Sequence, residues 1–401
     1  MPTESKFSID YLVGGLRISV DEDSATPGPR SHILNVIDAF RARAHTVRLH
    51  LANDAPGLAR LRGAPEGGGS TNFLAPLKRV LIDIVRLLAA VWSGLWVRRR
   101  ADKNSDVIYE RAAVLQDLTA FHPNKRRAFK IVESNGIMSE ETAQDRKALT
   151  FLSLAKFVER RLYRRADLIV SVSDPLARAI RDFAAVDHSK IVVVPNAISA
   201  DLIKLPVTPR SVFKLGFIGS VVPWQRVEVM LLGLQKCKNR ENMRASIVGA
   251  GSDLTKLRAL ARELGIDENV EFLGRLPRDA AIAEMRTWSV GYSGHVATTR
   301  EDMYHSPLKI YEYAALGMAI VATDYADARE LLADGCEIFI VETEDDVASA
   351  LDRAFEIWTR NGLPLPELAH NALRNHTWNA RVSQIEGAIS TSLNGLRELG
   401  A

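Results

Sequence analysis

Cysteine, long apolar runs and a strong net charge are all scarce in this sequence of 401 residues. The two cysteines, Cys237 and Cys336, have no CxxC spacing and no nearby histidine ligands. This excludes a disulfide framework and a zinc site, and it predicts two small core residues in a reducing compartment. The most apolar segment, residues 87–97, is far shorter than the roughly 20 residues that cross a bilayer, so we expect no membrane-spanning helix. The first residues lack a basic stretch followed by an apolar one, so we also expect no signal peptide.

The net charge of +3 is too small to indicate a nucleic-acid-binding protein, and 47% hydrophobic with 25% charged residues is typical of a globular chain. The charge is nevertheless divided unevenly. Residues 1–200 hold 30 Lys and Arg against 22 Asp and Glu, a net +8, and the remainder carries −5. A basic half joined to an acidic half favours two domains with different partners.

Short β-branched runs alternate with helical patterns along nearly the whole chain, which predicts an α/β fold with buried parallel sheets. The runs cover residues 7–14, 46–52, 106–110, 129–133, 167–173, 190–195, 214–220, 244–251, 270–276, 289–294, 319–324 and 337–341. Both periodicities break at residues 199–211, where two prolines lie, and the alternation then restarts. We therefore predict two Rossmann-like doubly wound domains, residues 1–204 and 205–376, and a helix over residues 377–401 that packs back on the first domain.

The strongest local motif is the segment Ser306-Pro-Leu-Lys-Ile-Tyr-Glu-Tyr-Ala-Ala-Leu-Gly317. Pro307 can begin a helix, whose first backbone N–H groups are available to an anion. Lys309 adds positive charge in the first turn. Glu312, almost one turn later, can accept the hydroxyls of a ribose, as acidic residues do in dinucleotide sites. This pattern indicates a site for a nucleoside diphosphate, although an isolated Glu on a helix is more often part of a surface ion pair.

The same segment closely resembles the SPLK-type donor site of the retaining glycosyltransferases of family 4, which have the GT-B fold. The resemblance extends in order and spacing over most of the chain. It also includes residues 107–111 (VIYER), 132–136 (VESNG), 165–176 (RADLIVSVSDPL), 190–198 (KIVVVPNAI), 216–228 (GFIGSVVPWQRVE), 270–277 (VEFLGRLP) and 376–378 (HTW).

The resemblance implies that the second domain binds a nucleotide sugar and neutralises the charge on its leaving diphosphate with amides and cations. The implied donor-binding residues are Gly219, Ser220, Gln225, Arg226, Arg275, Ser306, Pro307, Leu308, Lys309 and Glu312. Lys309 and Glu312 are also implied to be catalytic. Family members commonly carry Arg and Lys in the loop where this chain has Ser220 and Gln225.

The first domain is implied to bind the acceptor through Gly28, His32, Glu110 and Arg111, with Glu133 and Asn135 as further catalytic candidates. Glu110, Arg111, Glu133 and Asn135 fall at or just after predicted strand ends, where open α/β sheets place ligands. The alternative is a buried network around Glu110, Arg111 and Glu133 that only holds loops together.

We therefore expect a retaining, metal-independent transferase of hexosyltransferase type, which moves a sugar from a UDP- or GDP-type donor to an acceptor hydroxyl. The product could be a polysaccharide or other glycan, a glycolipid or a glycosylated metabolite, in a bacterial-type pathway. The alternatives are a non-catalytic relative that binds without turnover, and an epimerase or phosphorylase on the same fold. The resemblance implies no cofactor besides the donor and no metal; Asp21 and Asp23 are expected to be loop residues.

We expect a cytoplasmic enzyme, possible contact of the basic first domain with an anionic membrane at the inner face, no nucleic-acid partner, and an open oligomeric state. Residues 77–100 combine an apolar stripe with a basic end, which fits a membrane-surface helix, but a core-facing helix with a solvated end is the more common arrangement.

Overall fold

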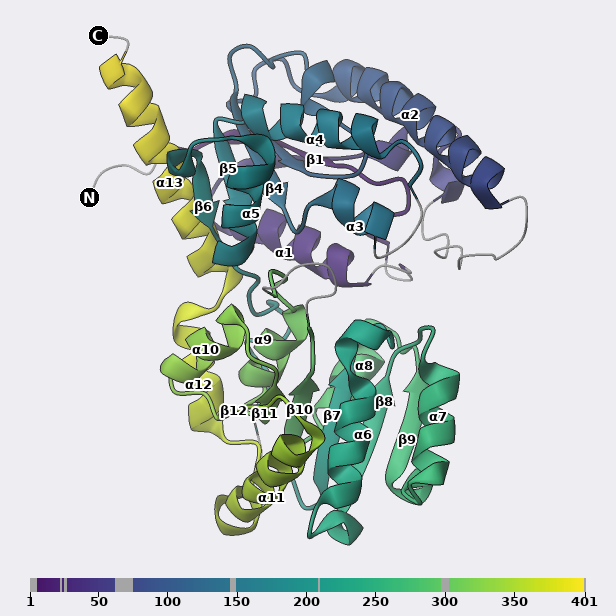
Figure 1. Cartoon of the computed structure of the whole chain (residues 1–401). Helices are drawn as coiled ribbons and strands as arrows, with labels where there is room; N and C mark the ends of the chain where they lie inside the picture. Colours follow the sequence, from purple (N-terminus) through teal and green to yellow (C-terminus); the bar gives the residue numbers. More distant parts are fainter. Residues whose placement is uncertain are drawn as a thin grey trace. The chain divides into compact units, whose positions relative to one another are not determined.

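The computed structural model describes residues 6–21, 24, 27–61, 75–144, 149–207, 210–296 and 303–399. These residues form two compact units, each built on a six-stranded sheet (Figure 1). All the strand pairs in both sheets are parallel. The predicted α/β class with two doubly wound sheets is therefore confirmed, and every predicted run holds a strand.

The sheet of unit 1 has the order β2-β1-β3-β4-β5-β6. Its strands are β1 (Ser8–Val13), β2 (Thr46–Leu51), β3 (Val107–Arg111), β4 (Phe129–Ser134), β5 (Leu168–Ser171) and β6 (Ile191–Val193). Its helices are α1 (Pro27–Ala42), α2 (Ala75–Arg100), α3 (Met138–Gln144), α4 (Leu152–Arg165), α5 (Asp174–Ala184) and α13 (Trp378–Leu399).

Successive residues of each strand in unit 1 face opposite helices, because side chains alternate across a sheet. Leu12 and Ile108 pack with Val97 of α2 on one face. Tyr109, from the next position of β3, makes an edge-to-face contact with Phe40 of α1 on the other. The sheet is therefore buried on both sides, as its apolar strands require.

The sheet of unit 2 has the order β12-β11-β10-β7-β8-β9. Its strands are β7 (Phe213–Ile218), β8 (Met243–Val248), β9 (Val270–Gly274), β10 (Val290–Ser293), β11 (Ala319–Ala322) and β12 (Ile338–Ile340). Its helices are α6 (Val227–Lys236), α7 (Leu254–Glu263), α8 (Arg278–Met285), α9 (Leu308–Ala315), α10 (Ala326–Ala333), α11 (Glu344–Asn361) and α12 (Pro366–Asn375).

Two apolar clusters cover the two faces of this second sheet. One joins β7 to α6, α7 and α11, and the other packs α8, α9, α10 and α12 against alternate residues of β8 and β11. Cys237 lies in the first cluster and Cys336 in the second, and both are buried free thiols. Burial raises the pKa of each thiol to about 12, so both act as small apolar core residues, as predicted.

The chain passes from unit 1 to unit 2 at Asn196 and returns at Trp378. The first crossing lies earlier than the predicted boundary at residue 205. The reason is that Asn196 bonds to Ser306 through its backbone N–H, and Ile198 forms a parallel bridge with Thr377. Both contacts hold the segment after Pro195 in unit 2.

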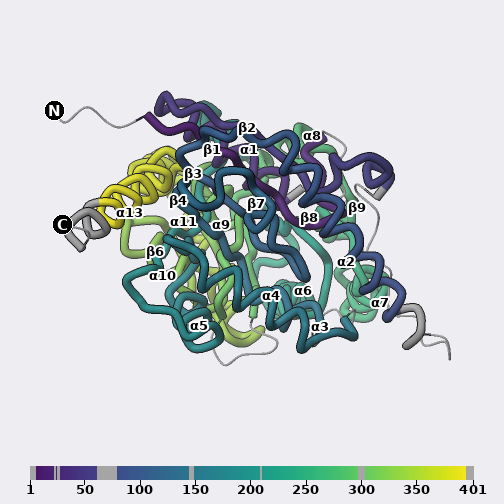
Figure 2. The backbone as a smooth tube through the Cα atoms, turned by 90° about the horizontal axis from the view of Figure 1, so that it is seen from above, coloured from purple at the N-terminus to yellow at the C-terminus, as the bar shows by residue number. Residues whose placement is uncertain are grey.

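The C-terminal helix α13 belongs to unit 1 and packs on α1, as predicted; Figure 2 shows α13 at the margin of that unit. Its Glu386 accepts hydrogen bonds from Arg43, at 2.7 Å, and lies 2.5 Å from His45, both just after α1. Burial would raise the pKa of Glu386, but these two partners outweigh it and lower the pKa. The helix is thus held by charged contacts as well as by apolar packing.

Helix α2 covers the segment that the sequence predicted to be an amphipathic helix, residues 77–100, and begins two residues earlier. Within Arg79–Arg100, an 18-residue window has a mean hydropathy of 1.9, so the helix is long and apolar enough to cross a membrane by length and composition alone. The apolar stretch is therefore longer than residues 87–97, on which the expectation of no membrane-spanning helix was based. One third of the 18-residue window is buried.

Candidate functional site

At the carboxyl edge of the second sheet, a turn at Gly219 brings the backbone close to Lys309. Gly219 follows β7 and has a φ of 144°, and its N–H donates to the carbonyl of Val248 at the end of β8. A Cβ atom at Gly219 would lie 3.0 Å from Lys309 Nζ. Only glycine combines this φ with such a close approach, so the turn leaves the lysine beside bare backbone.

Lys309, in the first turn of α9, is a buried cation. Its Nζ donates to Gln225 Oε1 at 2.7 Å and lies 4.0 Å from the centre of the Phe217 ring. Among the described residues no carboxylate pairs with it. Burial lowers the pKa of Lys309 to about 7, and the negative charge of Glu312 opposes the shift only partly. A bound anion would therefore supply the charge partner that Lys309 lacks.

His295, two residues after β10, completes this cluster. Gln225 Nε2 and His295 Nδ1 are 3.3 Å apart, so Gln225 joins the lysine to the histidine. The Nε2 atom of His295 is buried and has no hydrogen-bond partner among the described residues. Burial, helped by His305 and Lys309, holds the pKa of His295 well below its ordinary value, so the ring is neutral.

Glu312, one turn after Lys309, forms an ion pair with Arg278 at the start of α8. Arg278 Nη1 donates to Glu312 Oε1 at 2.6 Å, and the same guanidinium binds both carboxylate oxygens of Asp201. Glu312 Oε2 receives no hydrogen bond from the described residues. One oxygen of this buried carboxylate therefore remains able to accept from a ligand.

Ser306 fixes the start of α9 from outside. Its hydroxyl donates to Asp327 at 2.5 Å and accepts from the backbone N–H of Asn196 at 2.9 Å, while the side chain of Asn196 donates to its carbonyl. Pro307 is the N-terminal cap and Leu308 the first helical residue. The Ser306 side chain thus positions the helix start, and only the backbone beyond it is left for a ligand.

Three other predicted donor residues lie at the same edge of the sheet without joining the lysine. Arg226 has a left-handed φ of 47° and its guanidinium donates to the carbonyl of Glu342, so it binds the loop after β12 instead. Ser220 and Arg275 are exposed and directly follow the Gly219 turn and the end of β9. Arg226 therefore contacts a loop in the unliganded protein, and its role in donor binding stays a prediction.

Glu133, at the end of β4, is the centre of a polar cluster in unit 1. Arg111 and Asn135 donate to its Oε1 at 2.8 and 2.9 Å, and His32 Nε2 lies 2.8 Å from the same oxygen. The hydroxyls of Tyr109 and Tyr11 donate to its Oε2 at 3.0 and 3.2 Å. Four residues predicted from the sequence are thus brought together.

The Glu133 carboxylate is ionised and fully used by these contacts. Burial would raise its pKa, but the charges of His32 and Arg111 and the hydrogen bonds from its neighbours hold it well below the usual value. A carboxylate with five donors is a poor base or nucleophile. Glu133 therefore holds His32, Arg111 and Asn135 in place.

Glu110 does not belong to this cluster, contrary to the prediction. Arg111 is directly opposite Glu133 in the β3–β4 register, so Glu110 projects from the other face of the sheet. There it accepts from the N–H groups of Leu118 and Thr119 and from the Thr119 hydroxyl. Burial raises its pKa to about 7. Glu110 holds a loop, which is the alternative that the sequence left open.

Three residues around Glu133 were not predicted as site residues from the sequence: Tyr11, Tyr109 and Trp378. Tyr11 and Tyr109 are paired in the β1–β3 register and stack with ring centres 4.7 Å apart. Tyr109 shares the alternation of Arg111, which was the available signal. Trp378 packs edge-to-face on His32 at 4.8 Å and reaches it from α13. Gly28 lies in the first turn of α1, with open space where a Cβ would stand.

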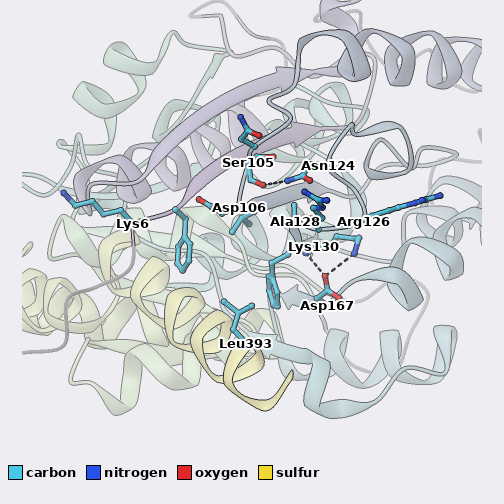
Figure 3. A pocket seen from close by; sticks show the side chains of 14 residues that line it. Lys6, Ser105, Asp106, Asn124, Arg126, Ala128, Lys130, Asp167 and Leu393 are labelled. Atoms are coloured by element: carbon cyan, nitrogen blue, oxygen red, sulfur yellow. Dashed lines mark hydrogen bonds and ion pairs between the residues drawn. The ribbon is translucent and has the colours of Figure 1, made fainter. Parts of the chain in front are cut away.

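A cavity of about 560 Å³ lies at the opposite, amino edge of the first sheet, between the strand starts and α13 (Figure 3). Asp106, Lys130, Asp167 and Leu393 are among its lining residues, and Lys130 pairs with Asp167 at 3.3 Å. The Glu133 cluster lies at the carboxyl edge of the same sheet, so the cavity is separate from it.

The two aspartates that were expected to be loop residues are Asp21 and Asp23. Asp21 accepts a hydrogen bond from Ser19 at 2.7 Å, and Asp23 lies outside the described residues.

Comparison with family models gives two matches. Residues 28–202 match the model described as Glycosyltransferase Family 4, and residues 212–357 match the model described as Glycosyl transferases group 1. A curated relative, one of the subunits of phosphatidylinositol N-acetylglucosaminyltransferase from Arabidopsis thaliana, is 24% identical over 207 residues. The match covers 47% of this chain and 41% of that relative, so it spans less than half of each protein.

Solved structures with similar folds cover almost the whole chain. Anabaena Alr3699/HepE in complex with UDP-glucose has a TM-score of 0.65 at 16% identity, covering 96% of this chain and 100% of that one. The lipopolysaccharide outer core galactosyltransferase WaaB has 0.63 at 15%, with 96% and 99% covered. Sucrose-phosphate synthase from Thermosynechococcus elongatus has 0.63 at 14%, with 97% and 100% covered. At these identities the likeness shows the fold alone.

Proposed function

Because the chain belongs to the glycosyltransferases of family 4 with the GT-B fold, we propose that it transfers a sugar, with retention, from a nucleoside diphosphate sugar to an acceptor hydroxyl. The observation that carries this proposal is the buried Lys309, which has no carboxylate partner among the described residues and lies beside the bare backbone of Gly219. Such a group is suited to the charge that develops on a leaving diphosphate.

In the donor half-site, the diphosphate binds between Lys309, the backbone after Gly219 and the first N–H groups of α9. Burial lowers the pKa of Lys309 in the unliganded protein, and the bound diphosphate raises this pKa, so that the lysine is fully protonated. Glu312 accepts a ribose hydroxyl on Oε2 while Arg278 holds its Oε1. His295 offers the sugar or the phosphate its unsatisfied Nε2. No resident metal is assigned to the reaction.

In the acceptor half-site, His32, Arg111 and Asn135 present hydrogen-bonding groups around the Glu133 carboxylate. A hydroxyl acceptor that also carries negative charge fits the guanidinium of Arg111. The transferred sugar is a hexose-type unit, and the leaving diphosphate takes the proton from the acceptor hydroxyl. In this scheme the protein supplies position and charge rather than a covalent nucleophile.

The test is a panel of UDP- and GDP-sugars offered to the whole protein, with UDP-glucose first, because one neighbour of similar fold was solved with it. We expect a thermal shift with one nucleotide series and slow release of free sugar with the configuration of the donor. Lack of binding by every donor would contradict the proposal. Binding without turnover, with acceptors supplied, would instead favour a non-catalytic relative.

A further inference from the structure

One side of helix α2 exposes a continuous apolar stripe. Its members recur at a spacing of one helical turn and are Leu81, Ile84, Val85, Leu88, Val91, Trp92 and Leu95. Leu81 and Leu88 are 60% and 66% exposed. The stripe runs for about 21 Å along the helix. A monomeric protein rarely leaves so long an apolar strip in water without a partner for it.

The opposite side of α2 is fastened to unit 1 along most of its length. Asp83 is buried and accepts from the backbone N–H groups of Thr150 and Phe151. Ser93 donates to the carbonyl of Ala52, at 2.5 Å, and Val97 lies in the core. A helix that crossed a bilayer would lose these polar contacts to hydrocarbon. The helix therefore lies along the surface of unit 1, although it is long enough to span.

Positive charge borders the stripe. Arg79 lies at one end and Arg98, Arg99 and Arg100 lie at the other, all exposed, and Arg100 lies over the Trp96 ring at 5.2 Å. The only acidic residue of the helix, Asp83, is buried. An apolar face bordered by arginine and tryptophan is typical of helices that lie in the interface of anionic membranes.

Helix α4 begins next to α2, because Asp83 of α2 accepts from the backbone N–H groups of Thr150 and Phe151, just before α4. Its exposed side carries Leu154 and Phe157, the latter 61% exposed, followed one and two turns later by Arg161 and Arg164. The same combination of apolar and arginine side chains thus appears on a second, connected helix.

We propose that the exposed stripe of α2 is a docking surface for a bilayer that contains anionic phospholipids, on which α2 lies flat. A second copy of the chain is a poorer occupant. Two stripes that face each other bring arginine against arginine in either orientation, since basic residues border both ends. The inference concerns unit 1 and is independent of the proposed donor site.

The test is co-sedimentation of the whole protein with vesicles of phosphatidylcholine alone and of phosphatidylcholine mixed with phosphatidylglycerol. We expect binding to the anionic vesicles, weaker binding at high salt, and a blue shift of tryptophan fluorescence. Leu81→Glu with Leu88→Glu should lower the partition coefficient by roughly tenfold or more for each side chain. These side chains face solvent, so the variants should fold normally.

Leu332→Glu, at an exposed apolar position of α10 in unit 2, is the matched control and should bind like the natural protein. Arg98→Gln with Arg99→Gln should weaken binding by roughly fivefold for each arginine and reduce its salt dependence. No binding to anionic vesicles, or equal binding by the Leu81/Leu88 variant, overturns the proposal. So does a dimer in sedimentation analysis that dissociates in that variant without any vesicle binding.

Discussion

Lys309 Nζ donates to Gln225 Oε1 over 2.7 Å, and this partner is neutral. The amide accepts from the lysine without neutralising its charge. The side-chain nitrogen of the same glutamine, Nε2, lies 3.3 Å from His295 Nδ1. Gln225 is therefore part of the immediate surroundings of Lys309.

Replacing Lys309 by Met should weaken the binding of UDP or GDP by about 10- to 100-fold, because a charge-assisted contact with phosphate is lost. Isothermal calorimetry with the free nucleotide measures this directly. Lys256→Met, an exposed lysine of α7 in the same unit, is the control and should bind normally. Equal affinity in both variants would remove Lys309 from the site.

Donor binding should also depend on pH. The pKa of Lys309 is about 7 in the unliganded protein, and a bound diphosphate raises it. The nucleotide therefore binds with proton uptake, and its affinity falls by up to about tenfold per unit as the pH rises above 7. Calorimetry in two buffers of different ionisation enthalpy detects the proton. In Lys309→Met this uptake and the fall in affinity should disappear; their persistence would point to another group.

Glu312→Gln should abolish recognition of the ribose. The natural protein should bind UDP more tightly than 2′,3′-dideoxy-UDP, because Oε2 accepts a hydroxyl. In the variant, which also weakens the pair with Arg278, the two nucleotides should bind equally. Glu263→Gln, at the exposed end of α7, provides the comparison. If the Glu312 variant keeps the preference for the hydroxyls, another group reads the ribose.

Glu133→Gln should lower the free energy of unfolding by roughly 3–5 kcal/mol at pH 7, because Arg111 is left without its carboxylate. Asp38→Asn, in the exposed pair with Arg41, should cost less than about 1 kcal/mol. Urea denaturation measures both. Since the pKa of Glu133 is depressed, the difference is fully present above its unfolded value of 4.5 and shrinks as the pH falls below it. A difference that stays constant down to acid unfolding would argue against an ionised Glu133.

The sequence was sufficient for the fold, because the strand patterns that predict it are local. The sequence could not settle which of two adjacent strand residues faces the Glu133 cluster. Glu110 and Arg111 are adjacent, yet only Arg111 shares a sheet face with Glu133. That choice depends on the register between strands, which a motif does not contain.

Side-chain direction was the other limit. Arg226 carries the right charge in the right loop, but its left-handed backbone sends the guanidinium to the carbonyl of Glu342. Ser306 lies in the motif, yet its hydroxyl is used by Asp327 and Asn196. The sequence underestimated the apolar length of α2 because isolated basic residues interrupt it in sequence but not along the helix surface.

The order in which the chain builds its two units has a consequence for synthesis. Unit 2 is inserted into unit 1, and its ends meet at the bridge between Ile198 and Thr377. A ribosome therefore completes unit 2 before it has made α13, the last piece of unit 1. Until then, the His32 side of α1 lacks Trp378, and Arg43 and His45 lack Glu386. Unit 2 can therefore fold before unit 1 is complete. A chain truncated before Trp378 should contain a folded unit 2 and an incompletely folded unit 1.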